Sequence, residues 1–498
     1  MDKIKKLAFP ILFILILIIF CYFRLKPIIN QTVPYTYDQG RDFLQAEAII
    51  RDKNLTFIGP TTGIPGVFHG AWWYYYLSIP YFLFNGALSS FYFFIFTSFL
   101  LVNLFFFYFL KKELNTISAA FFLASTVASP YFISVSIFVL NSFLVIPFLL
   151  LLFFSTYKFL QKEDFIYLFL VFLSLGFIFE SEIALGLFII PAYLVTILLT
   201  GSLKKYFGQI KKILLSFLGI LVPLSLRILF ELKHGFMQTK AFFYFFYHPT
   251  STNATTFKGT LIDRSKLFID YLIRLSPDSN IVLALLFVLL IVYLFTRGFR
   301  VLKPYQRTFV FFLSLFFLSL FFITLFYRNN FFWGYYVEGL PYFYLILSVF
   351  GIYTLSKERN KYAKISSWFF LAIFILFPFL LFTRELNKPH KNEGMIEQVM
   401  TVEKIYQTVG KNDFCARIYT PPVITYTYNY LFDHYSQTKG FKMPQTAYVK
   451  GQCWYIVEKD SYQFRVDNWR KENIPRVAKI ISTNHVSDSI SLELWEIK

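Results

Sequence analysis

The sequence predicts an α-helical polytopic membrane protein with a small mixed α/β domain at its C-terminal end. Three values support this fold class: of the 498 residues, 56% are hydrophobic and only 15% are charged, and the mean hydropathy is +0.54. Soluble domains contain fewer apolar and more charged residues. The same values exclude disordered, collagenous and disulfide-scaffold proteins. We therefore expect most of the chain to fold in lipid.

About eleven segments are predicted to span the membrane, since a bilayer core needs about 20 apolar residues per helix. They begin near residues 7, 89, 116, 140, 165, 183, 213, 281, 308, 335 and 366. The first follows three lysines and has no small-residue cleavage site behind it, so we interpret it as a retained anchor.

The distribution of positive charge predicts a cytoplasmic N-terminus. With that orientation the inside loops and the N-terminus carry 19 Lys and Arg residues, whereas the short outside turns carry one, Arg328. This asymmetry is the one that the positive-inside rule requires. The formal net charge of +19 is then mostly a topology signal in a plasma membrane protein, and we expect no nucleic acid partner.

Three outside segments are too long and too polar to be turns: residues 24–80, residues 230–280 and everything after residue 383. We expect residues 1–383 to form a transmembrane module and residues 384–498 to form a soluble extracytoplasmic domain.

The pattern of this C-terminal domain is mixed α/β. It has a polar helical stretch near residues 393–409, followed by strand-like pieces that read FCARIYT, CWYIVEK and SLELWEI. Cys415 and Cys453 lie in this domain, and the sequence leaves open whether they form a disulfide or remain two buried thiols.

The first outside loop carries the strongest functional pattern. Asp38 and Asp42 are four residues apart, so they share a face of the short amphipathic helix that the apolar residues from Phe43 to Ile50 predict. Asp38 is also placed to be the N-cap of that helix. In the alternative interpretation Asp38 is only this cap, and Arg41 and Asp42 form a solvated pair.

The loop continues with the turns GPTTGIPG and the aromatic segment HGAWWYYYLSIPYFLFNG, which leads into the next span. A surface helix followed by such turns and aromatics would enclose a cavity for a lipid head group. These residues resemble the GT-C superfamily of polyprenyl-phosphate-sugar-dependent glycosyltransferases, particularly glycosyltransferase family 39. The matching features are Asp38 at the start of an outside helix, FHGAWWYYYL and LFNG, and the resemblance extends over residues 1 to about 355. It departs from the family where His69, Gly70 and Ala71 replace a His-Pro-Pro element.

The resemblance implies a GT-C-like bundle and a specific chemistry. The donor would be a sugar on polyprenyl phosphate, the acceptor a hydroxyl of a glycan, lipid or protein on the outer face, and Asp38 the general base, with inversion at the anomeric carbon. Contacts to the donor phosphate and sugar are assigned to Arg41, His69, Arg328, Tyr75 and Glu180.

Other polar residues are candidates for the same cavity. Glu180 and Glu182 interrupt an apolar stretch, where a charge at the bilayer centre costs about 2.5 to 3.5 kcal/mol, but a simple turn is an equal alternative. Asn141 stands either as a helix cap or in the cavity wall, and Tyr336 either in the aromatic membrane belt or in the site. Asp42 is a further cavity candidate. Asp38 and Asp42 also offer oxygen ligands to a divalent cation, but we predict no metal site and no other cofactor.

Two other functions fit a polytopic protein with large outside loops. A transporter or flippase of lipid-linked glycans would show Gly/Pro-broken spans with charges deep inside them. A glycan polymerase or ligase would concentrate Arg and His in late loops, whereas here the signal lies in the first loop. The sequence contains no Gly-rich phosphate loop, which fits a lipid-linked donor rather than a nucleotide sugar.

Overall fold

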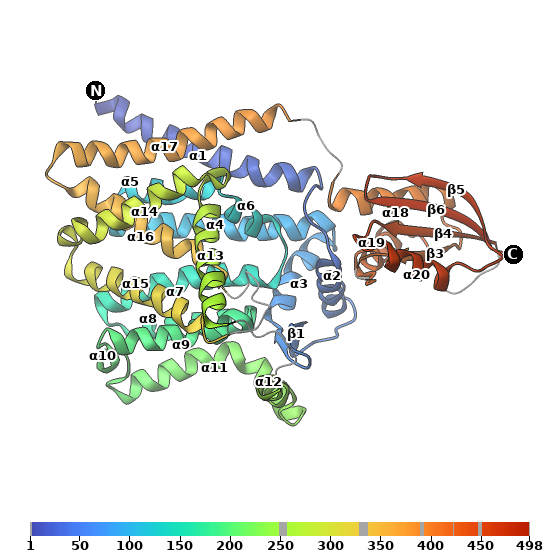
Figure 1. Cartoon of the computed structure of the whole chain (residues 1–498), viewed down its shortest axis with the longest axis horizontal. Coiled ribbons are helices and arrows are strands. Elements are labelled where there is room, and N and C mark those ends of the chain that lie inside the picture. Colours follow the sequence, from blue (N-terminus) through green and yellow to red (C-terminus); the bar gives the residue numbers. More distant parts are fainter. Residues whose placement is uncertain are drawn as a thin grey trace.

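The computed structural model describes residues 2–248, 256–327, 337–388, 393–421, 423–446 and 451–497. Its larger part is a bundle of helices that lie side by side, and its smaller part is a sheet with helices at one end of the bundle (Figure 1). The predicted fold class, a helical membrane bundle with a small mixed α/β domain, is confirmed.

A helix lies near each of the eleven predicted positions, but not all of these helices are long enough to cross a membrane. Seven described segments are long and apolar enough to cross a membrane: α1 (Asp2–Ile29, from Pro10), α4 (Leu88–Glu113), η1 with α7 (Asn141–Leu144 and Val145–Lys162), α11 (Ile210–Lys233), α15 (Pro304–Thr324), α16 (Leu340–Lys357) and α17 (Lys361–Leu386). An eighth is a pair bent by 71°, α5 (Thr116–Val127) and α6 (Pro130–Ile137). Three apolar helices are shorter: α8 (Phe165–Ser181), α9 (Ile183–Leu199) and α14 (Ile281–Thr296).

A fully buried arginine of α1 stabilises the bend between α5 and α6. Pro130 opens α6 and has no N–H group, so the last carbonyls of α5 need other donors. Arg24 supplies them, because its Nη2 donates to Thr126 O at 2.7 Å and its Nη1 to Val127 O at 3.0 Å. Its Nε also donates to Ser136 Oγ, in α6, at 2.9 Å. The arginine therefore ties both halves of the bent span to α1.

The elements outside the spans lie at both ends of the bundle (Figure 1). Two of them, α2 and α3, lie between the bundle and the C-terminal domain (Figure 1). The elements outside the spans are α2 (Tyr37–Ile50), β1 (Ile58–Thr61), β2 (Phe68–Gly70), α3 (Trp72–Phe84), α10 (Leu203–Phe207), α12 (Met237–Tyr247), α13 (Phe257–Leu275), η2 (Pro277–Ser279) and η3 (Gly298–Val301).

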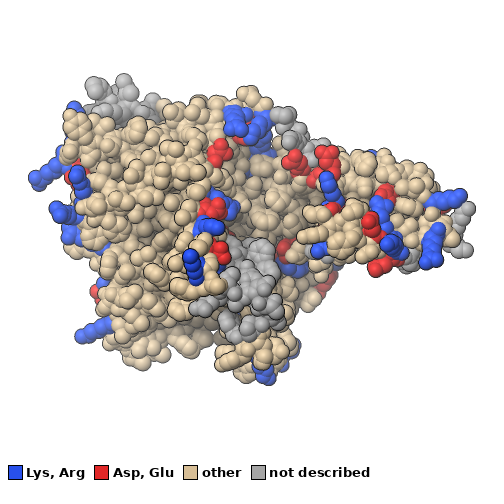
Figure 2. Space-filling model, viewed as in Figure 1, with Lys and Arg blue, Asp and Glu red and all other residues tan. Residues whose placement is uncertain are grey.

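The charges of the bundle follow the predicted orientation. Lys and Arg side chains gather at the end of the bundle that lies away from the C-terminal domain (Figure 2). This agrees with the inside loops proposed from the sequence, although the side of the membrane on which each terminus lies stays a prediction.

The C-terminal domain contains a four-stranded sheet of order β3-β4-β6-β5, in which β3 pairs parallel with β4 and the other pairs are antiparallel. The predicted helix and the three predicted strands are present. Its elements are α18 (Met395–Val409), β3 (Cys415–Tyr419), α19 (Tyr426–Lys439), β4 (Gly451–Glu458), α20 (Gln463–Asn473), β5 (Lys479–His485) and β6 (Ile490–Ile497).

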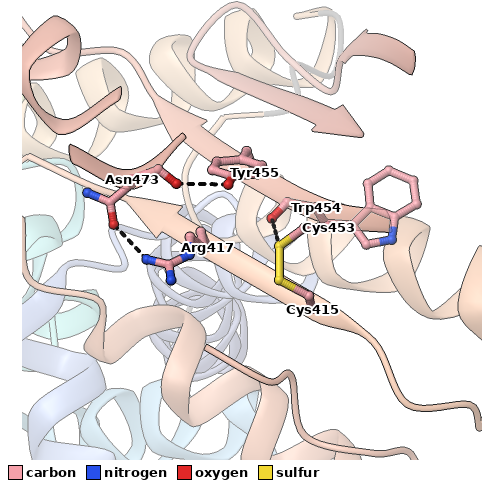
Figure 3. The surroundings of a disulfide bond; sticks show 6 residues. All are labelled: Cys415, Arg417, Cys453, Trp454, Tyr455 and Asn473. Atoms are coloured by element: carbon pink, nitrogen blue, oxygen red, sulfur yellow. Dashed lines mark hydrogen bonds between the residues drawn. A yellow bond between two sulfur atoms is a disulfide. The ribbon is translucent and has the colours of Figure 1, made fainter. Parts of the chain in front are cut away.

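A disulfide joins the two cysteines that the sequence left open. Cys415 and Cys453 face each other in register on β3 and β4 and are covalently bonded (Figure 3). Close by, Arg417 Nη1 donates to Asn473 Oδ1 at 2.9 Å and the Tyr455 hydroxyl donates to Asn473 O at 2.8 Å. These bonds fix α20 against the same two strands.

The C-terminal domain forms hydrogen bonds and close backbone contacts with the segment that carries α2. The backbone N–H of Met395 donates to Val33 O at 2.9 Å, and the Tyr35 hydroxyl donates to Thr427 O at 3.0 Å. Gly40 lies very close to the first residues of α19. A Cβ at this position would stand 2.4 Å from the backbone carbonyl carbon of Tyr426, the first residue of that helix. Only glycine allows this backbone-to-backbone approach.

Candidate active site

Helix α2 begins two residues before the position that the sequence predicted. Its N-cap is Thr36, whose backbone N–H and hydroxyl both reach the Gln39 side-chain oxygen at 2.7 Å. The prediction that Asp38 is the N-cap is therefore wrong, because Thr36 and Gln39 together satisfy the start of the helix. The Gln39 amide also donates to Val139 O at 2.9 Å, which fastens α2 to the segment after α6.

Three charged side chains of α2 form one cluster. Arg41 lies between the two carboxylates, with Nη1 2.9 Å from Asp38 Oδ1 and Nη2 2.8 Å from Asp42 Oδ1. The indole N–H of Trp73, in α3, donates to the other oxygen of Asp42 at 2.6 Å. The Asp42 side chain is completely buried, whereas Asp38 is 30% exposed and Arg41 20% exposed. The alternative of a solvated Arg41–Asp42 pair is thus wrong, and Asp38 is the accessible carboxylate of the cluster.

Burial shifts the protonation of both carboxyls in the same direction. It raises the pKa of Asp38 above its ordinary value, although the attraction and hydrogen bond of Arg41 work against this shift. Burial raises the pKa of Asp42 further, to about 6, against the same arginine and the bond from Trp73. In both groups the attraction and hydrogen bond of Arg41 favour the carboxylate form.

His69 lies on β2 with its imidazole buried next to the break between α8 and α9. Its Nδ1 accepts the backbone N–H of Ile183 at 3.5 Å, and its Nε2 is 4.0 Å from Glu182 Oε1. Burial, together with the cations Arg227 and Arg41, lowers the pKa of His69 to about 3. The imidazole is therefore neutral and contributes a hydrogen-bond donor rather than a positive charge.

The Asn141 side chain forms hydrogen bonds at the same break between α8 and α9, and it does not cap the helix that begins at Asn141. Its side-chain amide donates to Ser181 O at 2.6 Å and to Glu182 Oε2 at 3.3 Å. Both Glu180 and Glu182 are buried. These two residues therefore do not form the simple exposed turn that was the alternative interpretation of the sequence.

Glu180 pairs with a residue that the sequence analysis missed, Arg227 of α11. Arg227 Nε is 2.5 Å from Glu180 Oε1, and its two other nitrogens donate to Gln238 Oε1 at 2.7 Å and to Phe68 O at 2.9 Å. Gly70 lies so near that a Cβ there would stand 2.1 Å from Glu180 Oε2. The pair therefore holds the β1–β2 hairpin, and the signal that could have found it is an arginine inside an apolar span.

The aromatic run of α3 meets the cluster through Trp73 and Tyr74, whereas the predicted donor contact of Tyr75 stays a prediction. The Tyr75 hydroxyl points away, to Thr56 O at 2.7 Å. Its neighbours Trp73 and Tyr74 face the cluster instead, and burial with the adjacent Asp42 carboxylate raises the pKa of Tyr74. The helical periodicity explains this, since successive residues of α3 point in different directions.

The structure brings most of the predicted residues into one region. The cations Arg41 and Arg227 both lie within electrostatic range of His69, which joins the cluster of α2 to the residues at the α8–α9 break. Arg328 and Tyr336 lie outside the described residues. Within the described ranges no three His, Cys, Asp or Glu side chains are grouped as a metal site, and Arg41 bridges Asp38 and Asp42.

Comparison with known proteins gives matches at the level of structure. No protein-family model matches the sequence, and no curated protein is significantly similar to it. The crystal structure of ArnT from Cupriavidus metallidurans bound to undecaprenyl phosphate superposes with a TM-score of 0.60 at 10% identity, covering 97% of each chain. The apo state of the same ArnT gives 0.58 at 10% identity, covering 99% of this chain and 98% of that chain. The chain therefore shares the fold of these ArnT structures over almost its whole length, and this is the fold that the resemblance of its first loop led us to expect.

Proposed function

We propose that this chain transfers a sugar from a polyprenyl-phosphate donor to an acceptor hydroxyl at the outer face of the plasma membrane, with Asp38 as general base. The observation that carries the proposal is the difference between the two carboxylates on Arg41: Asp42 is sealed in the protein and Asp38 is accessible. The similarity to an ArnT structure that holds undecaprenyl phosphate supports the choice of a lipid-linked donor.

In this reaction Asp38 accepts the proton of the acceptor hydroxyl while the oxygen attacks the anomeric carbon. The bond between that carbon and the phosphate oxygen breaks, and the lipid phosphate leaves with the electron pair. A positioned general base contributes about 10² to 10⁴-fold to such a rate. Arg41 keeps Asp38 in place and is the candidate contact for the leaving phosphate, since part of its guanidinium is exposed.

The remaining predicted residues have supporting or unassigned roles in this proposal. His69, Asn141 and Glu182 hold the hairpin against the bundle, and Glu180 does so through Arg227. Contacts of the donor with Tyr75, Arg328 and Tyr336 stay predictions, as do the identity of the acceptor and the cytoplasmic N-terminus.

Replacement of the base tests the proposal. We expect Asp38→Asn to lose about 10² to 10⁴-fold in transfer while expression and membrane insertion stay at wild-type level, because the asparagine oxygen can still accept from Arg41. Asp52→Asn is the matched control, since Asp52 is an exposed carboxylate just beyond the same helix. Substrate and product are found by mass spectrometry of lipid-linked sugars and envelope glycans with and without the protein. Wild-type turnover by the Asp38 variant would leave that carboxylate no catalytic role.

A further inference from the structure

A second polar cavity lies beside the candidate site and has no role in the reaction described above. Its volume is about 190 Å³, and its walls come from α6, the segment that follows, α13 and the residue before Gly339. At about 30 Å³ of liquid volume per water molecule, it holds about six waters. This is the space of one small ring rather than of an extended chain.

One side of the cavity is a carboxylate held in a fixed orientation. The Tyr131 hydroxyl donates to Glu338 Oε1 at 2.6 Å and accepts the backbone N–H of Gly339 at 2.9 Å. A phenol that is bound on both sides cannot rotate away. Glu338 therefore presents a preorganised acceptor to whatever occupies the cavity.

Other lining residues carry donors that form no hydrogen bond with the described residues, although the Arg274 guanidinium carbon lies 5.7 Å from the centroid of the Tyr271 ring. Arg274, near the end of α13, has no hydrogen bond or ion pair from its guanidinium to any described residue, and its charge reaches Glu338 only electrostatically. Its backbone is anchored, because the Ser129 hydroxyl donates to Arg274 O at 2.8 Å. The hydroxyls of Ser134 and Ser142, which also line the cavity, likewise bind no described residue. Unused donors and acceptors around a cavity are typical of a ligand site.

The charges and the apolar walls of the cavity indicate which class of ligand it can bind. One cation opposes one carboxylate, so the cavity has no excess positive charge with which to hold a phosphate. Apolar walls that include Phe143 complete the lining, and a ring with hydroxyls at its edge and C–H groups on its face matches such a mixture. We propose that this cavity binds a single sugar ring, a step that rests on the proposed function and deepens it.

The cavity lies next to the part of the candidate site at the α8–α9 break. Glu338 lies within electrostatic range of Glu182, which Asn141 binds. Asn141 in turn stands between two residues of the cavity wall, Leu140 and Ser142. A ring held there would belong either to the lipid-linked donor or to a sugar acceptor, and the two sources are separated by experiment.

The test measures affinity with the purified full-length protein in detergent. The probes are undecaprenyl phosphate, undecaprenyl-phosphate mannose, glucose and aminoarabinose, and the methyl glycosides of the same sugars. The variants are Glu338→Gln, Arg274→Gln and the milder Ser142→Ala, with Asp270→Asn as control because Asp270 is exposed on the same helix as Arg274. For at least one sugar, wild type should bind the sugar-bearing lipid about tenfold more tightly than the bare lipid. The three variants should lose this preference and keep their affinity for undecaprenyl phosphate, which also shows that they are folded.

Other results have distinct meanings. If the variants keep the preference for the sugar-bearing lipid but lose the methyl glycoside, the cavity holds the sugar of the acceptor, and the proposal stands. If the variants keep both the preference for the sugar-bearing lipid and the binding of the methyl glycoside, the proposal is overturned. It is also overturned if they lose affinity for the bare lipid to the same extent, because the cavity would then be a phosphate site. If wild type binds none of the polyprenyl phosphates, the proposed donor fails; the cavity proposal then stands only if the variants lose a methyl glycoside that wild type binds.

Discussion

Gly40 provides a direct test of how the C-terminal domain fixes the proposed base. This glycine lies within α2, next to Arg41, where a Cβ would meet Tyr426 C at 2.4 Å and Thr427 N at 2.5 Å. Ordinary van der Waals contact begins at 3.4 Å. Gly40→Ala therefore requires α2 and α19 to separate by about 1 Å, because backbone atoms cannot rotate aside as a side chain can.

The two effects of this substitution have opposite signs. In an exposed helix, glycine to alanine stabilises by about 1 kcal/mol. Overpacking against a rigid neighbour costs about 1 to 3 kcal/mol, and the upper part of that range applies here, so a net destabilisation of about 1 to 2 kcal/mol remains. A displacement of 1 Å near the reacting groups can also cost about 10²-fold in rate. Sugar transfer by Gly40→Ala should therefore fall much more than its stability.

Thermal unfolding, hydrogen exchange over α19 and sugar transfer measure these effects. Gly63→Ala is the matched control, since no atom lies within 4 Å of a Cβ at that position of the same loop. Tyr426→Ala is the second control, because the Tyr426 backbone makes the contact and its side chain is exposed. A Gly40→Ala protein that is more stable than wild type and fully active would refute the reasoning.

Three further predictions concern stability. Burial raises the folded-state pKa of Asp42 from 3.8 to about 6. This carboxyl therefore contributes up to about 3 kcal/mol of stability that is present below pH 3.8 and lost as the pH rises through 6. In thermal melts recorded across this pH range, Asp42→Asn should lose this pH dependence of stability, and an equal pH dependence in wild type and variant would contradict the prediction. Arg24→Met leaves buried carbonyls without donors and should cost about 3 to 5 kcal/mol in detergent melts, far more than Lys26→Met on the same helix. Replacing both Cys415 and Cys453 by alanine opens a loop with a sequence separation of 38 and should lower the free energy of unfolding by about 4 kcal/mol. Wild-type protein with the disulfide reduced should unfold at the same temperature as the double variant.

The spans and the strands of the C-terminal domain could be predicted because each depends on a local pattern. A run of 20 apolar residues is long enough to cross a bilayer whatever its neighbours are. The continuous apolar run of β4, rich in aromatic and β-branched residues, likewise appears in the sequence itself. The start of α2 shows the limit of such patterns: both Thr36 and Asp38 are good N-caps, and the partner Gln39 decides between them.

The partners of the charged residues could not be predicted, because each lies far away along the chain. Glu180 pairs with Arg227 and Asp42 binds Trp73, separations of 47 and 31 residues. A sequence shows that a charge in an apolar segment needs compensation but does not show which residue supplies it. That Trp73 rather than Tyr75 contacts Asp42 could not be predicted for a related reason, since the rotation of α3 about its axis depends on what it packs against.

The position of Asp38 is set from three directions, and this explains why the base could be proposed from sequence while its geometry could not. Gln39 fastens α2 to Val139, 100 residues along the chain. The cluster of Arg41 and Asp42 binds α3 through Trp73, and Gly40 admits the backbone of α19 from the C-terminal domain. Because consecutive residues of a helix point in different directions, positions 39 to 42 can contact three separate parts of the protein while Asp38 stays accessible. The C-terminal domain, which follows the last apolar helix of the bundle, is thus part of what fixes the position of the proposed base.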